Sequence, residues 1–556
     1  MQYLIILFSA LVGTIIITPY FIDLLNKIKI VDVPDGLRKL HSSPIPRMGG
    51  LLIFLVFFAS IFIFYGDLNS IKYYLFGAIL IFSLGAYDDL LGTGYILKFL
   101  YQIITSAFLL IYLFPKFNSV SVFTLELPII PSVILLVFFI VGTINSFNLL
   151  DGLDGLVAGI SLLIFTLLFF VSLNSLDTFS LVVLSAIIGC LLGFLKYNGF
   201  PARIFLGDSG SFLLGYLVVS AVLLLSIDKH THVLDLTFPI ILLAVPLADT
   251  LKVMFGRLIS GKHPFLADRS HIHHIVFSKN ITHKTTVFII TIYSLIFAGN
   301  AVIYRYYSES VGMLLFLFLI LPLIFANPIL QFIIKTDRLV KIGRAINRFP
   351  QFLINYYKIG VLPIVSLFTI IYFIYLILSK DSSISELFYP SIILIVLLLI
   401  FTIINYSKNK ILTDIIVFFN IIIFFIINQQ NLILYKDIME LPILGNLNYN
   451  LLIIAILLPV IGFFLIFRER LKMQNGIFFT GLDLIIILIV LLLSITSGLI
   501  PISKSYIIAD TIFRSYLIYT FYKVLIHIEP KFRIYIYIFS FLIAISSQTV
   551  YLFLGK

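Results

Sequence analysis

Long apolar runs, separated by short polar segments, follow one another along almost the whole chain. The first of them extends from Tyr3 to Leu25, and a membrane span needs roughly 20 mostly apolar residues. Within a bilayer the backbone must satisfy its own hydrogen bonds, so each run is predicted to be a helix. We therefore expect an all-α, polytopic integral membrane protein with about 15 to 18 transmembrane helices.

The composition supports a membrane protein and excludes a water-soluble domain. Hydrophobic residues make up 61% of the 556 residues and charged residues only 11%, whereas a water-soluble domain carries about 25% charged residues. The net charge of +11 could indicate a nucleic-acid partner. Because the cations gather in alternate loops, we expect the bilayer and no nucleic acid.

The distribution of lysine and arginine predicts the orientation. Several cations follow the first apolar run: Lys27, Lys29, Arg38, Lys39 and Arg47. The next loop holds only Lys72, and the alternation continues downstream. Since cytosolic loops carry an excess of lysine and arginine, we expect the amino terminus outside and the first loop in the cytosol.

The two halves of the chain differ in character. Polar motifs punctuate the helix ends up to about residue 330, and the remainder is mostly apolar. We expect a membrane core over 1–334 with about 11 helices and a hydrophobic extension over 335–556 with about seven. An accessory domain, a homodimer surface and a second activity all stay open for the extension.

Five acidic residues occur where acids are expensive. They are Asp88, Asp89, Asp151, Asp154 and Asp208. An aspartate at the centre of a membrane helix costs about 2.5 to 3.5 kcal/mol. All five fall at predicted cytosolic helix ends, so they can face one aqueous cavity. The alternative is that each is only a solvated helix end or a cap.

The spacing of these acids indicates a metal site. Asp151 and Asp154 share a face if they lie on a helix. Asp88 and Asp89 are adjacent, and converging carboxylates repel unless a cation lies between them or one is protonated. Such an oxygen site suits Mg²⁺, with Mn²⁺ as the alternative, because Mg²⁺ commonly binds one or two carboxylates together with substrate phosphates.

Histidines cluster in a basic loop that includes Arg269, His271, His273 and His274. We expect this loop to bind phosphate or pyrophosphate. A zinc site is the rival interpretation, but the nearby cysteines and the HExxH spacing that would strengthen it are missing. An uninvolved surface loop is the third possibility.

Two further cations are candidates for phosphate contacts. Arg47 precedes Gly49 and Gly50 at the start of the second run, where a role as a positive-inside anchor is the alternative. Lys98 lies in a run that should be apolar, and an intramembrane lysine needs a carboxylate or phosphate partner unless it extends to the interface.

In their order along the chain, these motifs resemble one family, the polyprenyl-phosphate N-acetylhexosamine-1-phosphate transferases of glycosyltransferase family 4 type. The motifs are RKLHSSPIPRMGG, the Asp88–Asp89 pair, NSFNLLDGLDGL, PARIFLGDSGS and DRSHIHH. The His-Ile-His-His form looks like the undecaprenyl-phosphate N-acetylglucosamine-1-phosphate branch, as distinct from the muramoyl-pentapeptide branch. The resemblance covers residues 1 to about 330.

The resemblance implies a metal-dependent reaction of a UDP-N-acetylhexosamine with polyprenyl phosphate, which gives polyprenyl-diphospho-sugar and UMP. This would be the first membrane step of a cell-envelope glycan, at the cytosolic face of the plasma membrane. A muramoyl-pentapeptide-type reaction and a polytopic lipid or sugar transporter are the alternatives. A transporter should carry its charges near the bilayer midplane, whereas these charges lie toward one face.

The resemblance also assigns roles to residues. Asp208 would be the metal ligand, with Asp89 as a second ligand, and Asp88 and Asp89 the catalytic pair. Asp88 would accept a proton from the lipid phosphate or orient it. Asn148, Asp151 and Asp154 would line the nucleotide-sugar site, and Arg269, His271, His273 and His274 would hold phosphate or sugar.

Overall fold

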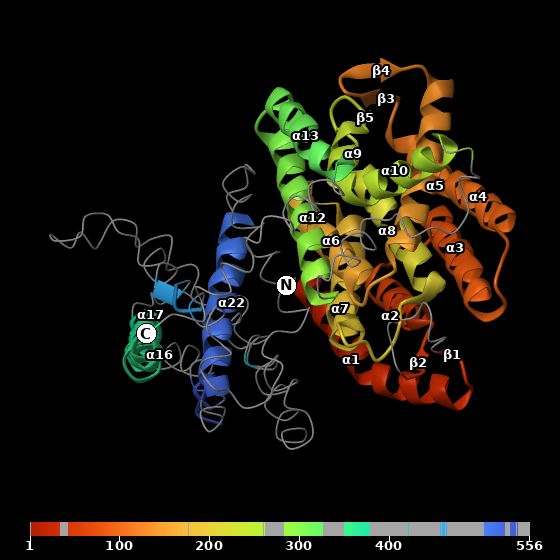
Figure 1. Ribbon diagram of the computed structural model, residues 1–556. Coiled ribbons are helices and arrows are strands. Elements are labelled where there is room, and N and C mark those ends of the chain that lie inside the picture. Colours follow the sequence, from red (N-terminus) through yellow and green to blue (C-terminus); the bar gives the residue numbers. More distant parts are fainter. Residues whose placement is uncertain are drawn as a thin grey trace. The chain divides into compact units, whose positions relative to one another are not determined.

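The computed structural model is predominantly helical, as the apolar runs predict (Figure 1). It describes residues 2–33, 43–175, 177–259, 261, 283–325, 350–378 and 505–528, with isolated residues between 417 and 463 and between 534 and 542. These residues form two compact units. One contains the described residues up to Phe325, and the other begins at Pro350 and includes the helix over 505–528. The expected domain boundary at 334/335 lies outside the described residues.

The first unit is a bundle of apolar helices. Its long helices are α1 (Gln2–Lys27), α2 (Gly49–Phe64), α3 (Lys72–Leu91), α4 (Tyr95–Leu113), α5 (Ile129–Leu150), α6 (Leu156–Ser175), α7 (Thr178–Asn198), α8 (Gly207–Ser226), α10 (Ala244–Ile259), α12 (His283–Tyr306) and α13 (Glu309–Ile324). Short elements are η1 (Phe114–Lys116) and α9 (Thr237–Leu242). Each apolar run was expected to form one helix, but the run near residue 246 is interrupted at Leu243, between α9 and α10.

Two small sheets mark the two ends of this bundle (Figure 1). At one end, β1 (Val31–Asp32) pairs antiparallel with β2 (Ile45–Pro46). At the other, β3 (Ser119–Val122) lies between β4 (Leu125–Leu127), which is antiparallel to it, and β5 (Val233–Asp235), which is parallel.

Helices α7 and α8 form the centre of the bundle, since nearly all their residues are buried. Helix α8 packs against α3, α5, α2 and α6, and α7 packs against α1. Glycines permit the closest approaches. A Cβ on Gly189 would lie 2.2 Å from the carbonyl oxygen of Leu7. Close packing around α7 and α8 therefore fixes the positions of their ends. The candidate site lies at the amino-terminal end of α8.

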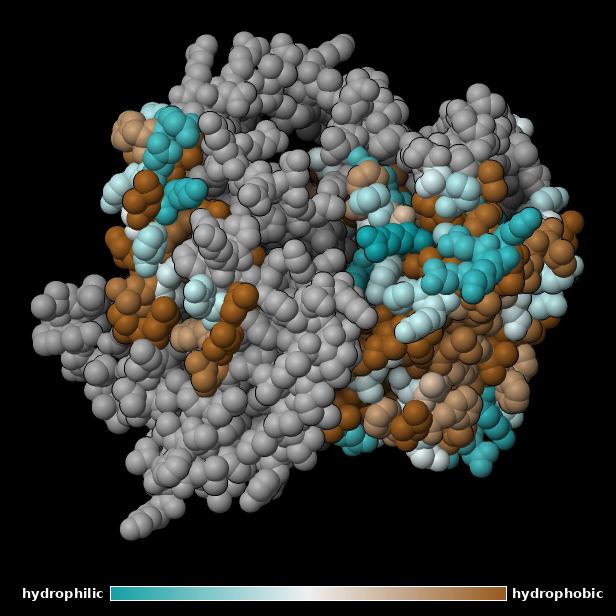
Figure 2. Space-filling model, turned by 90° about the horizontal axis from the view of Figure 1, so that it is seen from below, coloured by the Kyte–Doolittle hydropathy of each residue, from teal (hydrophilic) through white to brown (hydrophobic). Residues whose placement is uncertain are grey.

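Eight helices in the described part of the chain are long and apolar enough to cross a membrane, and three further apolar helices are shorter. Together with the helical content, they confirm an all-α, polytopic membrane protein. The remaining predicted spans fall partly outside the described residues. Seen from the end where β1 and β2 lie, hydrophilic surface on this unit is bordered by hydrophobic side chains (Figure 2).

In the second unit, α16 (Gln351–Tyr356), η2 (Tyr357–Val361) and α17 (Leu362–Leu378) are continuous along the chain, and α22 spans Ser505–Ile528. The Tyr357 hydroxyl donates to the carbonyl of Val460 at 2.7 Å. The residues of α22 from Arg514 to Phe521 are all buried. A segment buried on every face is typical of the interior of a membrane bundle.

The predicted orientation can be tested with single cysteines. The native Cys190 is fully buried, so it gives no background labelling. A cysteine at exposed Ser43 should react with a membrane-impermeant maleimide only after the cells are opened, whereas one at exposed Asn69, in the loop between α2 and α3, should react in intact cells. The reverse pattern would overturn the orientation.

Candidate active site

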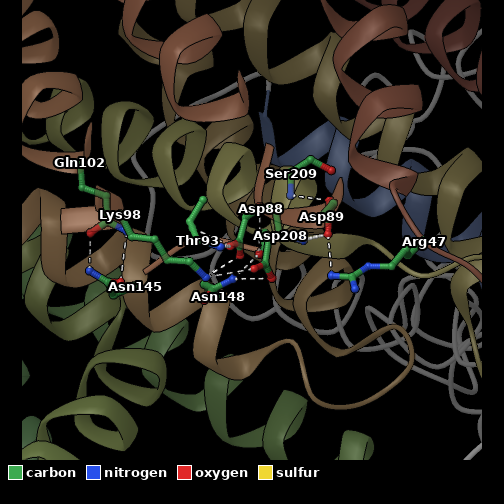
Figure 3. A network of polar contacts seen from close by, with 11 residues as sticks. Arg47, Asp88, Asp89, Thr93, Lys98, Gln102, Asn145, Asn148, Asp208 and Ser209 are labelled. Atoms are coloured by element: carbon green, nitrogen blue, oxygen red, sulfur yellow. Dashed lines mark hydrogen bonds and ion pairs between the residues drawn. The ribbon is translucent and has the colours of Figure 1, made fainter. Parts of the chain in front are cut away.

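Asp88 and Asp208 converge on a single ammonium group. Asp88 lies in the last turn of α3, Asp208 in the first turn of α8, and Lys98 in the first turns of α4. The Lys98 Nζ lies 2.5 Å from Asp88 Oδ2 and 3.3 Å from Asp208 Oδ2 (Figure 3). An intramembrane lysine was expected to need a carboxylate or phosphate, and the structure provides two carboxylates.

The loop between α3 and α4 holds the second oxygen of Asp88. The Thr93 backbone N–H and hydroxyl both donate to Asp88 Oδ1, at 2.6 and 2.5 Å. Gly92 allows the chain to fold back there, because its φ is +73°, a region that favours glycine. Asp88 is thereby fixed with its other oxygen toward Lys98.

Asn148 holds the other oxygen of Asp208 from a third helix. In the last turn of α5, the Asn148 Nδ2 donates to Asp208 Oδ1 and to the Ser211 Oγ, both at 3.0 Å. Two turns further into the bundle from the start of α4, Gln102 and Asn145 join α4 to α5. Gln102 Nε2 donates to Asn145 Oδ1 at 3.1 Å, and Asn145 Nδ2 donates to Gln102 Oε1 at 2.6 Å (Figure 3).

Asp89 points away from Lys98 and toward α8. Its Oδ1 accepts from the Asp208 N–H at 2.9 Å, and its Oδ2 accepts from the Ser209 N–H at 3.0 Å. Arg47 donates from Nη2 to Asp89 Oδ1 at 2.9 Å, so the carboxylate has a guanidinium partner (Figure 3). The adjacent aspartates thus contact different groups.

Asp151 and Asp154 differ from the expected arrangement. Both lie in the turn between α5 and α6 and not on one helix face, because α5 ends at Leu150 and Gly155 has φ +74°. Asp154 Oδ2 accepts from the Ala202 N–H at 3.0 Å, and the Asp154 N–H donates to His283 Nε2 at 3.1 Å. Asp154 therefore links the α5–α6 turn to the segment before α8 and to the start of α12.

Asp151 is in an unfavourable electrostatic environment. Burial raises its pKa well above the usual range, and the negative charges of Asp208, Asp89 and Asp154 raise it further, while Arg47 opposes them. A cation or a hydrogen-bond donor placed beside this carboxyl would lower its pKa, because it would stabilise the charged form.

A large cavity extends from this cluster into the bundle. Its volume is about 1420 Å³, which exceeds the roughly 300 to 1,000 Å³ that is usual for small-molecule sites. Its lining includes Lys98 and Asn148 of the cluster, and also Asp151. Most of its wall is apolar and comes from α4, α5, α10 and α13, including Phe99, Ile103, Phe138, Leu247 and Ile320. The cavity is therefore mostly hydrophobic and is joined to the charged cluster through Lys98 and Asn148.

Several residues of the site were missed or differently placed by sequence reasoning. Arg257, which was not among the expected site residues, is buried in the last turn of α10 and lines the cavity with Thr250 and Lys252. A charged residue within an apolar run was the available signal. Arg269, His271, His273 and His274 lie outside the described residues.

The carboxylates suit a divalent cation. Asp88 and Asp208 already share one monovalent cation, Lys98, and together they offer two oxygen-donor side chains. Mg²⁺ takes one or two carboxylates and completes its shell with water and substrate phosphates. The described residues contain no group of three or more His, Cys, Asp or Glu side chains that could enclose a metal.

Comparison with known proteins gives the family. The sequence model of glycosyl transferase family 4 matches residues 71–226. A probable undecaprenyl-phosphate N-acetylglucosaminyl 1-phosphate transferase of Bacillus subtilis is 34% identical over 320 residues, which are 56% of this chain and 87% of the relative. The chain belongs to glycosyl transferase family 4.

Other members of the family are similar over the same extent. An undecaprenyl-phosphate alpha-N-acetylglucosaminyl 1-phosphate transferase of Salmonella typhimurium is 30% identical over 56% of this chain and 88% of its own length. A phospho-N-acetylmuramoyl-pentapeptide-transferase of Clostridium acetobutylicum is 32% identical over 52% and 92%. The family match from α3 through α8 contains Asp88, Asp89, Asn148 and Asp208.

The raised pKa of Asp151 predicts a pH-dependent effect on stability. A carboxyl whose pKa is raised in the folded state destabilises that state increasingly as the pH rises from its unfolded pKa, about 3.9, through its folded pKa. Asp151→Asn should therefore unfold at a higher temperature than the unaltered protein, by about 2 °C or more near pH 8, with a smaller difference near pH 5. Thermal unfolding in detergent measures this.

The control for this experiment is Asp67→Asn, in the exposed loop between α2 and α3. It should not shift the unfolding temperature at either pH. An Asp151→Asn variant that is less stable than the unaltered protein at pH 8 would show that the carboxylate is stabilised in the folded state, contrary to the expectation.

Proposed function

We propose that the chain transfers N-acetylhexosamine 1-phosphate from a UDP-sugar to polyprenyl phosphate, giving polyprenyl-diphospho-sugar and UMP. The observation that carries the proposal is the Asp88–Lys98–Asp208 cluster, whose Lys98 also lines a large, mostly apolar cavity. The names of the Bacillus and Salmonella relatives describe a transferase of this kind on undecaprenyl phosphate.

The cavity matches the two parts of a polyprenyl phosphate. A phosphate at the Lys98 end would meet an ammonium group and the Asn148 amide, while the isoprenoid chain would lie along the apolar walls of α4, α5 and α10. Placing the phosphate here exchanges a carboxylate partner of Lys98 for a phosphate oxygen, so the ammonium remains paired.

The reaction needs positioning and charge neutralisation more than covalent chemistry. An oxygen of the lipid phosphate attacks the β-phosphorus of the UDP-sugar, the bond from that phosphorus to the bridging oxygen breaks, and UMP leaves with the bond electrons. We assign to Asp88, one oxygen of which is held by Thr93, the role of orienting the lipid phosphate or accepting its proton. Lys98 donates hydrogen bonds to phosphate oxygens.

We propose Mg²⁺, or Mn²⁺, as the cofactor, with Asp208 as the principal ligand. When bound, the ion would neutralise charge on the diphosphate of the UDP-sugar. Asn148 and Lys98 bond to the two oxygens of Asp208, and its side chain is 27% exposed, so an ion can reach it. Asp89, also expected as a ligand and a catalytic residue, has both of its oxygens engaged by the chain.

The nucleotide-sugar is proposed to bind at the α5–α6 turn. Asp151 lies at the cavity, and a hydrogen-bond donor on the uridine would relieve its unfavourable environment. Asn148 and Asp154 would border the same site, and Arg269, His271, His273 and His274 would hold phosphate or sugar. The plasma membrane, a cytosolic active site and a homodimer belong to the same proposal.

The Clostridium relative favours a second candidate, transfer of phospho-N-acetylmuramoyl-pentapeptide. It uses the same phosphate chemistry and differs in the sugar substituent. A panel of UDP-sugars distinguishes the two, because UDP-N-acetylglucosamine should support UMP release and UDP-N-acetylmuramoyl-pentapeptide should not.

The proposed function predicts a metal-dependent reaction that requires Asp208. Purified full-length protein, incubated with undecaprenyl phosphate, UDP-N-acetylglucosamine and Mg²⁺, should release UMP, and a chelator should stop the release. Asp208→Asn keeps the side-chain shape but loses its charge, so the turnover rate should fall by about 1000-fold.

Asp67→Asn, the same substitution at an exposed acid far from the cluster, should retain full activity and shows that the assay reports the site. UMP release that continues in the chelator, or an Asp208→Asn variant with normal turnover, would refute the metal assignment. Absence of UMP release with every UDP-sugar of the panel would refute the transferase.

A further inference from the structure

The Asp89 carboxylate accepts hydrogen bonds from other groups of the protein. Its two oxygens accept from the backbone N–H groups of Asp208 and Ser209 and from the Arg47 guanidinium. The Asp89 side chain has no exposed surface, whereas that of Asp208 is 27% exposed. A substrate or metal ion can therefore reach Asp208 but not Asp89 in this arrangement.

The two backbone donors belong to the first turn of α8. The first N–H groups of a helix have no partner within the helix, and an anion at a helix amino terminus is favoured by the helix dipole. No side chain caps α8 at Leu206, the residue before its first turn. Asp89 supplies the missing acceptor from α3, and so connects the end of α3 to the start of α8.

Glycines make this connection close. A Cβ on Gly207, whose φ is +76°, would lie 2.6 Å from Asp89 Oδ2. A Cβ on Gly85, one turn before Asp89, would lie 2.5 Å from both the Asp208 carbonyl oxygen and the Ser209 Cα. Both glycines are needed for α8 to approach the carboxylate, so the position of Asp208 depends on the contact with Asp89.

Arg47 reaches Asp89 because its segment pairs with the segment before α8. The Phe205 N–H donates to the Pro46 carbonyl, the Gly49 N–H to the Phe205 carbonyl, and the Gly50 N–H to the Leu206 carbonyl, each at 2.8 Å. These bonds hold Arg47 beside α8. Its guanidinium provides the positive charge that the buried Asp89 carboxylate requires.

We infer that Asp89 and Arg47 are positioning residues, which orient Asp208 by fixing the first turn of α8, and that neither binds metal or substrate. The adjacent aspartates then divide two tasks, with Asp88 paired to Lys98 and Asp89 bonded to the α8 backbone. This inference rests on the proposed function and changes the roles expected for Asp89 and Arg47 within it.

Binding of Mn²⁺ to the full-length protein, measured by electron paramagnetic resonance, separates a ligand from a positioning residue. Asp208→Asn should weaken Mn²⁺ binding by about 30-fold or more, as expected for loss of a ligand. Asp89→Asn should change it by less than about 5-fold, yet lower kcat by about 100-fold with little change in either KM. Asp67→Asn should change none of these quantities.

The pair with Arg47 gives a second readout. Arg47→Met leaves Asp89 without its counter-charge, so it should lower both kcat and the unfolding temperature. In Arg47→Met/Asp89→Asn no buried carboxylate is left without a partner, so the double variant should be no worse than Arg47→Met alone. Gly207→Ala, which changes no charged group, should lower kcat as Asp89→Asn does.

Three results would overturn the inference. Asp89→Asn could lose Mn²⁺ as completely as Asp208→Asn, Arg47→Met could raise the KM of one substrate by about 10-fold with kcat unchanged, or the two substitutions could lower the unfolding temperature additively. Failure of the proposed function is a different outcome, in which the unaltered protein releases no UMP. The unfolding temperatures of the Arg47 and Asp89 variants still test the positioning role in that case.

Discussion

Three buried or partly buried carboxylates meet at the amino-terminal end of α8, and their need for positive charge is the constraint on which the arrangement depends. Lys98 lies between Asp88 and Asp208, and Arg47 pairs with Asp89. Removing one partner from a buried pair leaves a costly unpaired charge. The ends of α3, α4 and α8, and the segment before α2, are therefore held together by these ion pairs.

This constraint also explains how the site can serve an anionic lipid. The three carboxylates exceed the two cations by one negative charge, and Asp151 lies close enough to contribute to the same field. A divalent cation would compensate that excess and leave one positive charge to attract phosphate. Lys98 and Asn148 belong both to this cluster and to the wall of the mostly apolar cavity, so a lipid phosphate can reach them while its chain stays in a hydrophobic environment.

Much of this could be predicted from the sequence because acids and lysines in apolar runs are conspicuous. The helix ends that carry Asp88, Asn148 and Asp208, and the need of Lys98 for an anionic partner, follow from local pattern. The division between Asp88 and Asp89 does not. It depends on the direction of each side chain at the end of α3 and on the close approach of α8 at Gly85 and Gly207, which are properties of packing.

Two other features of the site also depend on packing and could not be predicted from the sequence. The spacing of Asp151 and Asp154 suggested a shared helix face, but the end of α5 at Leu150 places them in a turn. The reciprocal amide pair of Gln102 and Asn145 joins residues 43 positions apart, and a sequence pattern gives no sign of such a pairing. Family resemblance supplied the roles expected for Asp88, Asp89 and Asp208, and the contacts of Asp89 led us to propose a different role for it.

The charge balance at the start of α8 can be measured directly by a double-mutant cycle on Lys98 and Asp88, with the free energy of unfolding at neutral pH as the readout. Lys98→Met leaves two carboxylates without their shared cation and should be strongly destabilising. Adding Asp88→Asn should restore part of the loss, with a coupling energy of about 1 to 3 kcal/mol. Additive effects of the two substitutions would contradict the account, because Lys98 would then not be the cation that holds Asp88 and Asp208 together.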